Sequence, residues 1–232
     1  MNKVFREEKK FLLNIEEYIK TSRRLEQVMA QDPHNGPDGY PVRSLYFDTV
    51  YDSDFFEKED GLELRRKVRL RVYDPDADFA MMEIKQKEGS FQMKRSLRVT
   101  REDGMRIAAG EYEALLGYGD PFAAECYALM RSRCYRPVTV VEYDRKAFVA
   151  KENDIRITFD SNISAAESSL DVFSPKLNTV PVIDRFDVLL EVKYNGFMLD
   201  YLRGLLNAVD KSELSVSKYT LARQNAYQTH IF

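Results

Sequence analysis

Arginine and lysine recur at every second position in several segments of this chain, a spacing that puts their side chains on one face of a β-strand. The clearest run alternates basic with apolar residues at Arg65, Lys67, Arg69 and Arg71. Like charges on one strand face repel each other, so this run is costly on a merely solvated surface. A bound polyanion removes that cost, because guanidinium groups form paired hydrogen bonds with phosphate and ammonium groups act as point charges. The pattern therefore predicts chemistry on phosphate chains.

The basic residues are concentrated in one part of the chain rather than abundant throughout it. The 232 residues have a formal net charge of -3, which argues against a general nucleic-acid-binding surface. Between Gly61 and Arg101, however, eleven basic residues stand against six acidic ones, a net charge of +5. For any single strand, a charged face that meets only water is the simpler interpretation. Five strands with this alternation favour anion binding instead.

Carboxylates share the polar positions of these strands: Glu8, Glu83, Asp160 and Glu191. A carboxylate there can hold a divalent metal that bridges phosphate oxygens, or it can form an ion pair with a neighbouring Arg or Lys. We expect ion pairs for Glu8 and Glu83. For Glu191 we favour the metal.

Histidine and cysteine are too scarce for several common kinds of site. With only His34 and His230, neither a zinc cluster nor a Ser-His-Asp triad is plausible. Cys126 and Cys134 lie eight residues apart in a stretch with helical periodicity, so we expect free thiols in a reducing cytoplasm. No apolar run approaches the ~20 residues that span a bilayer. The sequence therefore predicts a cytoplasmic protein.

The two hydrophobic periodicities predict an α+β protein dominated by an antiparallel sheet, in one domain over residues 1–232. Strands are expected at 5–13, 43–48, 64–72, 80–85, 91–99, 138–149, 155–160 and 188–194. Helices are expected at 15–29, which Asn14 would cap, and at 111–116, 123–133, 197–209 and 217–227. A barrel with its apolar face outward needs helices to cover the outside, and its lumen would be a basic tunnel.

Seven short motifs, taken in order, resemble the VTC domain. They are Arg6-x-Glu8-x-Lys10-Phe11, Arg65-x-Lys67-x-Arg69-x-Arg71-x-Tyr73, Glu83-x-Lys85, Asp144-Arg145-Lys146-Ala147-Phe148, Arg156-x-Thr158-x-Asp160, Glu191-x-Lys193 and Ser217-Lys218-Tyr219. The VTC domain is the catalytic domain of the vacuolar transporter chaperone polyphosphate polymerases and their bacterial relatives, within the CYTH-like triphosphate tunnel metalloenzymes. The resemblance runs from about residue 5 to residue 223.

The resemblance implies an antiparallel β-barrel, the triphosphate tunnel, of about eight strands with helices packed outside. It implies transfer of the γ-phosphoryl group of ATP to a growing polyphosphate chain, with Mn²⁺ or Mg²⁺. It assigns substrate binding to Lys10, Arg69, Arg71, Lys85, Lys94, Arg145, Arg156 and Lys193. It assigns the metal to Glu191 and catalysis to Lys218 together with Glu191. Arg95 replaces Lys94 if the strand register shifts by one residue.

One departure from the wider superfamily bears on the reaction. Hydrolytic members begin with Glu-x-Glu-x-Lys, whereas the first position here is Arg6. A cation in place of a carboxylate favours binding of phosphate over activation of water by two metals. We therefore rank a polymerase above a hydrolase. The alternatives are a metal-dependent tripolyphosphatase or nucleoside triphosphatase, and a non-catalytic polyphosphate-binding module.

The expected partners are ATP and inorganic polyphosphate or triphosphate, with no nucleic acid. The eukaryotic polymerases also carry membrane helices and a phosphate-sensing domain, which this sequence lacks. We therefore expect a cytoplasmic protein that can reach the membrane through a separate membrane-protein partner.

Overall fold

The strands dominate the computed structural model, which describes residues 6–89, 91–207 and 213–229. All eight predicted strands are confirmed, except that position 5 of the first lies outside the described residues. Two short strands, β2 and β9, were not predicted. The strands are β1 (Arg6–Asn14), β2 (Ala30–Gln31), β3 (Tyr40–Thr49), β4 (Leu64–Val72), β5 (Phe79–Glu88), β6 (Phe91–Thr100), β7 (Tyr135–Ala150), β8 (Ile155–Ala166), β9 (Val180–Pro181) and β10 (Asp187–Asn195). The predicted α+β class is confirmed.

The helices follow the prediction less closely. They are α1 (Ile15–Leu25), α2 (Ser53–Glu59), α3 (Arg101–Ala108), η1 (Tyr112–Tyr118), α4 (Pro121–Ser132), η2 (Glu152–Asp154), α5 (Asp200–Asn207) and α6 (Lys218–Thr229), where η marks a 3₁₀-helix. The predicted end of the first helix at residue 29 is wrong, because α1 stops at Leu25. The helices α2 and α3 were not predicted. Positions 208 and 209 of a predicted helix, and His230, lie outside the described residues.

The strands are hydrogen bonded in the order β1-β10-β8-β7-β3-β4-β5-β6. The pairs β1 with β10, β10 with β8, β3 with β4, β4 with β5, and β5 with β6 are all antiparallel. The order has two ends, β1 and β6, and no pairing of described residues closes the sheet between them. The large antiparallel sheet is thus confirmed, and among the described residues no strand pairing closes it into the predicted barrel.

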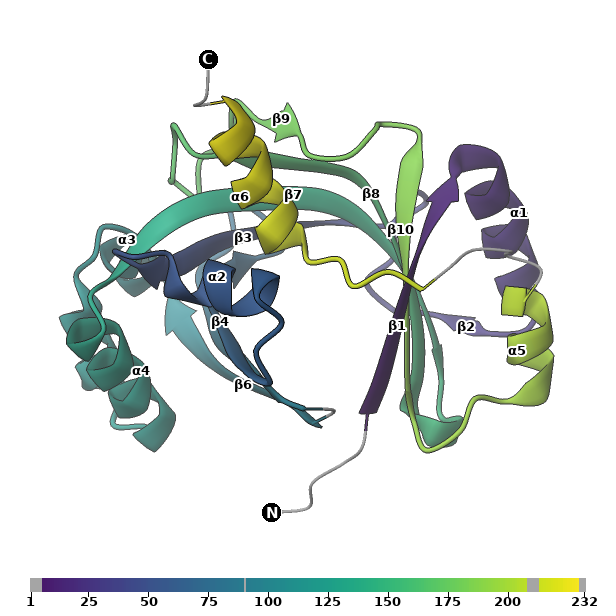
Figure 1. The fold of residues 1–232 in the computed structure, drawn as a ribbon, viewed down its shortest axis with the longest axis horizontal. Helices are drawn as coiled ribbons and strands as arrows, with labels where there is room; N and C mark the ends of the chain where they lie inside the picture. Colours follow the sequence, from purple (N-terminus) through teal and green to yellow (C-terminus); the bar gives the residue numbers. More distant parts are fainter. Residues whose placement is uncertain (1–5, 90, 208–212, 230–232) are drawn as a thin grey trace. The chain divides into compact units, whose positions relative to one another are not determined.

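The chain forms two compact units, which we describe separately. Unit 1 comprises Met1–Pro41, Tyr143–Ile163 and Ile183–Val216, and unit 2 comprises Val42–Glu142, Ser164–Val182 and Ser217–Phe232. Figure 1 shows that segments distant in sequence contribute to each unit. The prediction of a single domain over residues 1–232 stays a prediction.

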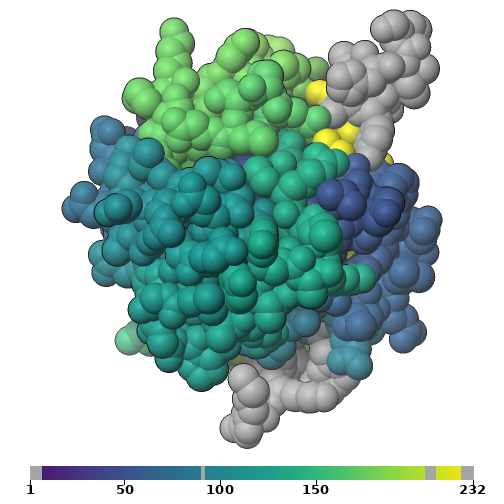
Figure 2. Space-filling view, turned by 90° about the vertical axis from the view of Figure 1, so that its left-hand side faces the viewer, coloured from purple at the N-terminus to yellow at the C-terminus, as the bar shows by residue number. Residues whose placement is uncertain are grey.

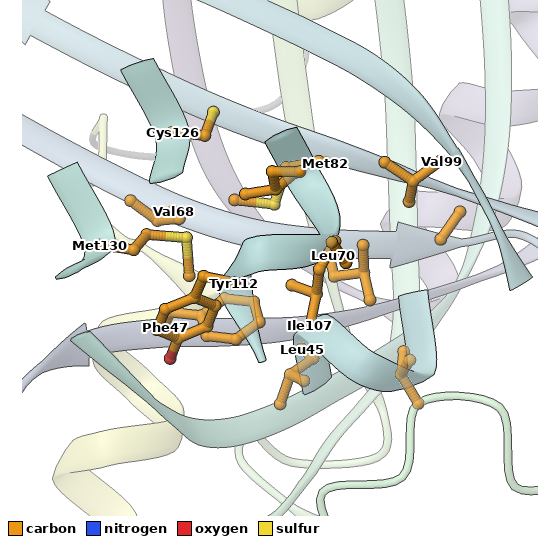
Figure 3. Close-up of a cluster of buried hydrophobic side chains, with 14 of the residues drawn as sticks. Leu45, Phe47, Val68, Leu70, Met82, Val99, Ile107, Tyr112, Cys126 and Met130 are labelled. Atoms are coloured by element: carbon orange, nitrogen blue, oxygen red, sulfur yellow. The ribbon is translucent and has the colours of Figure 1, made fainter. Parts of the chain in front are cut away.

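In unit 2, helices cover the apolar face of the sheet. Alternate residues of β3 and β4, among them Phe47 and Leu70, pack against Ile107 of α3, Tyr112 of η1 and Met130 of α4 (Figure 3). Figure 2 shows the teal part of the chain, which includes these helices, from its outer side. The residues between these apolar positions point to the opposite face of the strands. That opposite face carries the charges.

In unit 1, α1 contacts β1, β10 and α5. The buried core there includes Leu13, Phe159 and Leu190. Asn14 caps α1 as predicted: its side chain accepts a hydrogen bond from the Glu17 backbone N–H at 2.9 Å, and the Glu17 carboxylate accepts one from the Asn14 N–H at 2.9 Å. This cap fixes the turn at which β1 ends and the helix begins.

Two findings concern features that the sequence analysis argued against, a disulfide and a membrane-spanning helix. Cys126 is buried in α4 and Cys134 is exposed beyond the end of that helix, and neither forms a disulfide. The free thiols are therefore as predicted, although Cys134 is not helical. Among the described residues, no helix combines the length and the apolar character that crossing a membrane requires.

Candidate functional site

One face of β4, β5 and β6 collects the predicted cations of unit 2. In the antiparallel register Lys85 lies opposite Lys67 on one side and Lys94 on the other, and Arg69 lies opposite Glu83. Directly opposed residues share a face, and so do alternate residues of one strand. Because α6 brings Lys218 to the same group, as described below, we define the basic face as Lys67, Arg69, Arg71, Lys85, Lys94 and Lys218 with Glu83.

Glu83 holds the basic face together. Its Oε2 lies 2.6 Å from Arg69 Nη2 and 4.0 Å from Arg71 Nη1, and its Oε1 lies 2.7 Å from Lys94 Nζ. Burial alone opposes the charge of this carboxylate, which is 2% exposed, but the three cations outweigh burial and lower the pKa of Glu83 to about 2. The ion pair expected for Glu83 is present, and it fixes the positions of both arginines.

The strand register also distinguishes Lys94 from its neighbour Arg95. Arg95 points to the opposite side of β6, where its Nη2 lies 2.6 Å from Glu125 Oε1 of α4 and its guanidinium lies 4.9 Å from the centre of the Phe122 ring. Lys94 therefore belongs to the basic face, and Arg95 belongs to the contact between the sheet and the helix.

The first turn of α6 brings Lys218 to the basic face. Lys218 is 8% exposed, and its positive charge is one cause of the lowered pKa of Tyr46 on β3. The ring of the next residue, Tyr219, stacks on the Tyr46 ring. Ser217, just before the helix, accepts hydrogen bonds from Lys67 Nζ at 2.5 Å and from the Thr220 backbone N–H at 3.3 Å. The start of the helix is thus tied directly to β4.

Two further contacts fix α6 on unit 2. The Tyr219 hydroxyl donates a hydrogen bond to the carboxylate of Asp48, which also accepts hydrogen bonds from the backbone of α2. Arg223 lies 2.8 Å from Asp52 Oδ2 and 2.8 Å from Glu167 Oε1. These contacts are made by residues that follow Lys218 in α6. They hold the helix in place and so restrict where the Lys218 side chain can lie.

Tyr46 is a residue of this site that the sequence analysis missed. Its ring stacks on Tyr219 with centroids 5.1 Å apart, and its hydroxyl accepts a hydrogen bond from Arg69 Nη1 at 3.2 Å. Burial raises the pKa of Tyr46, but Arg69, Arg71 and Lys218 together bring that pKa below its ordinary value. The sequence did hold one signal for Tyr46. Its neighbours Leu45 and Phe47 are apolar, and alternation within β3 puts Tyr46 on the opposite face of the strand.

Unit 1 contains a second charged group, which we call the mixed-charge cluster: Glu8, Lys10, Arg145, Asp160, Glu191 and Lys193. In the register of β1 and β10, Lys10 lies opposite Glu191 and Glu8 lies opposite Lys193. Lys10 Nζ is 3.1 Å from Glu8 Oε1, and Lys193 Nζ is 2.8 Å from Glu191 Oε2. The ion pair expected for Glu8 is present, and Glu191 also has cationic neighbours.

Arg145 is fixed by Asp160 in the same cluster. Its Nε and Nη2 donate to the two carboxylate oxygens of Asp160 at 2.7 and 2.8 Å, a bidentate pair with a fully buried carboxylate. Arg145 Nη2 is also 3.9 Å from Glu191 Oε2. Burial disfavours the charge of Arg145, but its acidic neighbours, Asp160 foremost, raise its pKa well above the usual value. Arg145 is therefore permanently charged.

Arg156 lies opposite Lys193 in the register of β8 and β10, and it has its own acidic partner. Its Nη2 is 2.6 Å from Asp32 Oδ2 and 3.0 Å from the Tyr40 hydroxyl. Burial raises the pKa of Asp32, but hydrogen bonds from His34 and the charge of Arg156 lower it overall. These contacts hold Arg156 in one position at the rim of the cluster.

The mixed-charge cluster fits a divalent metal only if the substrate supplies part of the coordination. Among the described residues, no group of three or more His, Cys, Asp and Glu side chains could hold a metal. Glu8 and Glu191, however, both lie within 4 Å of the same two ammonium groups, Lys10 Nζ and Lys193 Nζ, so their carboxylates are close together. Mg²⁺ and similar ions bind through one or two carboxylates plus phosphate oxygens. Such an ion fits this pair.

The cations predicted to bind substrate fall into two sets, one in each unit. Lys10, Arg145, Arg156 and Lys193 belong to unit 1, and Arg69, Arg71, Lys85 and Lys94 belong to unit 2. That all of them line one tunnel stays a prediction.

Several solved structures share this fold at low sequence identity. An adenylyl cyclase candidate from Hippeastrum, described as having a dominant triphosphatase activity, is 12% identical with a TM-score of 0.56, covering 94% of this chain and 96% of that one. An adenylate cyclase candidate from Vibrio parahaemolyticus is 11% identical with a TM-score of 0.50, covering 95% and 98%. The Mediator head module of Schizosaccharomyces pombe also matches, at 7% identity and a TM-score of 0.50, covering 90% and 96%.

At these identities the likeness shows a shared fold, and it does not bear on activity. The family follows from the sequence itself: the model of the VTC domain matches residues 5–227, so this chain belongs to the VTC domain family. A search of curated proteins found no match to the chain.

Proposed function

We propose that this chain is an ATP-dependent polyphosphate polymerase. In the reaction, an oxygen of the terminal phosphate of a polyphosphate chain attacks the γ-phosphorus of ATP. The bond from that phosphorus to the β,γ-bridging oxygen breaks, and ADP leaves. The products are ADP and a chain one phosphate longer.

The observation that carries the proposal is the excess of positive charge on the basic face in a member of the VTC domain family. Phosphoryl transfer needs little covalent chemistry from a protein, but it does need phosphates held in line and their negative charge neutralised. Fixed arginines meet both needs, since Glu83 orients Arg69 and Arg71 in advance of binding.

In this proposal each cation has a stated role. Arg69, Arg71, Lys85 and Lys94 neutralise the triphosphate of ATP, and Lys218 donates to the phosphate that is transferred. The first turn of α6 favours anions, which supports that role for Lys218. Lys10, Arg145, Arg156 and Lys193 bind phosphates in unit 1.

Glu191, together with Glu8, would hold the divalent metal, Mn²⁺ or Mg²⁺. When bound, such a metal supplies Lewis-acid stabilisation of charge on phosphate oxygens. The residues of the cluster itself orient these carboxylates, because Lys10, Lys193 and Arg145 surround Glu191. Substitution of Glu191 is therefore expected to change the metal requirement rather than the fold.

Incubation of the purified protein with ATP and Mn²⁺, followed by electrophoresis of the products, tests the proposal. A polymerase produces a ladder of long phosphate chains, and the Lys218→Ala variant is expected to produce none. Release of orthophosphate without chains would favour the tripolyphosphatase or nucleoside triphosphatase. Tight, salt-sensitive binding of polyphosphate without turnover would favour the binding module.

A further inference from the structure

The hydroxyl of Tyr46 lies among the cations of the basic face. The Tyr46 side chain is 5% exposed, and its ring is held by stacking on Tyr219. On the neighbouring strand, Arg69 donates a hydrogen bond to the Tyr46 oxygen at 3.2 Å, and the Arg69 guanidinium lies 5.9 Å from the centre of the Tyr46 ring. The position of this hydroxyl is therefore fixed from two sides.

In the hydrogen bond with Arg69, the Tyr46 hydroxyl is the acceptor. Its own proton still needs an acceptor. A phenol can accept hydrogen bonds and donate one, and a buried donor without an acceptor is costly. Within the described parts of the chain, the hydroxyl of Tyr46 accepts from Arg69 and donates to no side chain or backbone group. Its proton therefore lacks an acceptor among these residues.

The neighbouring acceptors are already engaged. Ser44, two residues earlier on β3, accepts a hydrogen bond from Arg71 Nε at 3.0 Å. Asp48, two residues later, accepts from Tyr219 and from the backbone N–H groups of Thr49, Asp54 and Phe55. Glu83 binds Arg69 and Lys94.

Cations from two elements act on the Tyr46 hydroxyl. Arg69 and Arg71 come from β4, and Lys218 comes from α6. All three attract an anion, and a phosphate oxygen among them is an acceptor of the strength that a phenol proton requires.

We propose that Tyr46 is a substrate-binding residue whose hydroxyl donates a hydrogen bond to a phosphate oxygen of the anion held by Arg69 and Arg71. This inference rests on the proposed function, because it concerns the same phosphate-binding face. It adds a neutral donor to a site otherwise made of cations. Cations attract any anion, whereas a fixed hydroxyl proton selects an oxygen at one position.

The pH dependence of binding separates Tyr46 from the surrounding cations. Burial raises the pKa of Tyr46, and Arg69, Arg71 and Lys218 lower it below the ordinary value of 10.0. Below that pKa the phenol donates its proton to phosphate; above it, the phenolate has no proton to donate and repels the anion. Phosphate binding is therefore expected to weaken as the pH rises through the pKa of Tyr46.

Calorimetric titration of the full chain with inorganic tripolyphosphate tests this inference. The Tyr46→Phe variant is expected to bind roughly ten- to a hundredfold more weakly at neutral pH, the usual effect of losing a hydrogen bond to a charged group. The same variant should also lose the part of the alkaline weakening that begins below the pH range in which lysines lose their charge. Tyr112→Phe is the matched control, because the Tyr112 hydroxyl is buried in the same unit and bonds to the Tyr135 carbonyl, away from the basic face.

A second measurement does not depend on how well the variant folds. Spectroscopic titration of tyrosinate in the wild type should show one tyrosine that ionises below the usual pH, and tripolyphosphate should raise its pKa. Equal binding by the wild type and Tyr46→Phe at every pH, or a tyrosine titration that tripolyphosphate leaves unchanged, would overturn the role of Tyr46. Absence of tripolyphosphate binding by the wild type would overturn the proposed function itself.

Discussion

The basic face of unit 2 and the mixed-charge cluster of unit 1 contain similar residues in different balance. In the mixed-charge cluster, the carboxylates of Glu8, Asp160 and Glu191 match three cations in number. On the basic face as defined, Glu83 is one carboxylate among six cations. By this count the charges of the first group balance, and the second group has an excess of cations.

This difference indicates different tasks for the two groups. Under the proposed function, binding of phosphate would reduce the repulsion among the arginines and lysines of the basic face. The mixed-charge cluster is stable alone, and its carboxylates are held in place by their neighbours. Such a group is suited to positioning and to sharing a metal with phosphate oxygens.

The largest expected effect is on turnover, through Lys218. In Lys218→Ala the reacting phosphate loses a fixed donor, and the rate of polyphosphate synthesis should fall about a hundred- to a thousandfold. Synthesis rates at saturating ATP measure this effect. Lys176→Ala, which removes an exposed lysine of the same unit, is the control and should keep its activity. A wild-type rate in Lys218→Ala would remove this lysine from the mechanism.

Glu83→Gln tests how the basic face is held together. The pKa of Glu83 in the folded protein, about 2, lies below its ordinary value of 4.5. Ionised Glu83 therefore contributes stability that is fully present above about pH 4.5 and is lost as the pH falls towards 2. We expect Glu83→Gln to lower the free energy of unfolding by about 3 kcal/mol at neutral pH, and the difference from wild type to shrink in acid.

Urea denaturation over a series of pH values, with and without tripolyphosphate, measures the effect of Glu83→Gln. Tripolyphosphate should restore part of the lost stability, because it neutralises the same cations. A loss of stability that did not change with pH would contradict the electrostatic role assigned to Glu83.

Glu191→Gln tests the mixed-charge cluster in the same way. The variant loses a metal-binding carboxylate but keeps a side chain of the same shape, so we expect turnover to fall about ten- to a hundredfold. Activity should recover in part at higher Mn²⁺ concentration, which a titration of rate against metal would show. Glu152→Gln, at an exposed site of unit 1, is the control. An unchanged metal requirement in Glu191→Gln would count against a metal at this residue.

The smallest effect is expected in the mixed-charge cluster. Lys193 balances Glu191, so Lys193→Gln should destabilise the protein by ~0.5–1 kcal/mol. Thermal unfolding at low salt measures this change. An unchanged thermal stability in Lys193→Gln would contradict the balance of charges assigned to this cluster.

The strands and their charged positions could be predicted because alternation is a local property of the sequence. Strand register is not a local property, because it depends on which strands pair. The choice between Lys94 and Arg95 depended on the pairing of β5 with β6, which puts Lys94 opposite Lys85 and turns Arg95 towards Glu125. The contacts of the carboxylates likewise depend on which strands become neighbours.

The helices α2 and α3 were missed because the local sequence pattern does not mark where they begin. The backbone N–H groups at the start of α2 are satisfied by Asp48, a residue of the preceding strand, while Asp52 adopts a left-handed conformation. The helix α3 starts at Arg101 directly after β6, where Thr100 serves as the cap, so no loop marks the change. Tyr46 was missed because its importance comes from Arg69, Arg71 and α6, which are distant in sequence.

The stoichiometry of the products formed from ATP and Mn²⁺ by the wild-type chain tests the central claim most directly. Phosphorus NMR of the reaction should show ADP and newly formed internal phosphates of polyphosphate accumulating in step, with little orthophosphate. Accumulation of ADP and orthophosphate in equal amounts, with no internal phosphate signal, would contradict the claim that this chain is a polymerase.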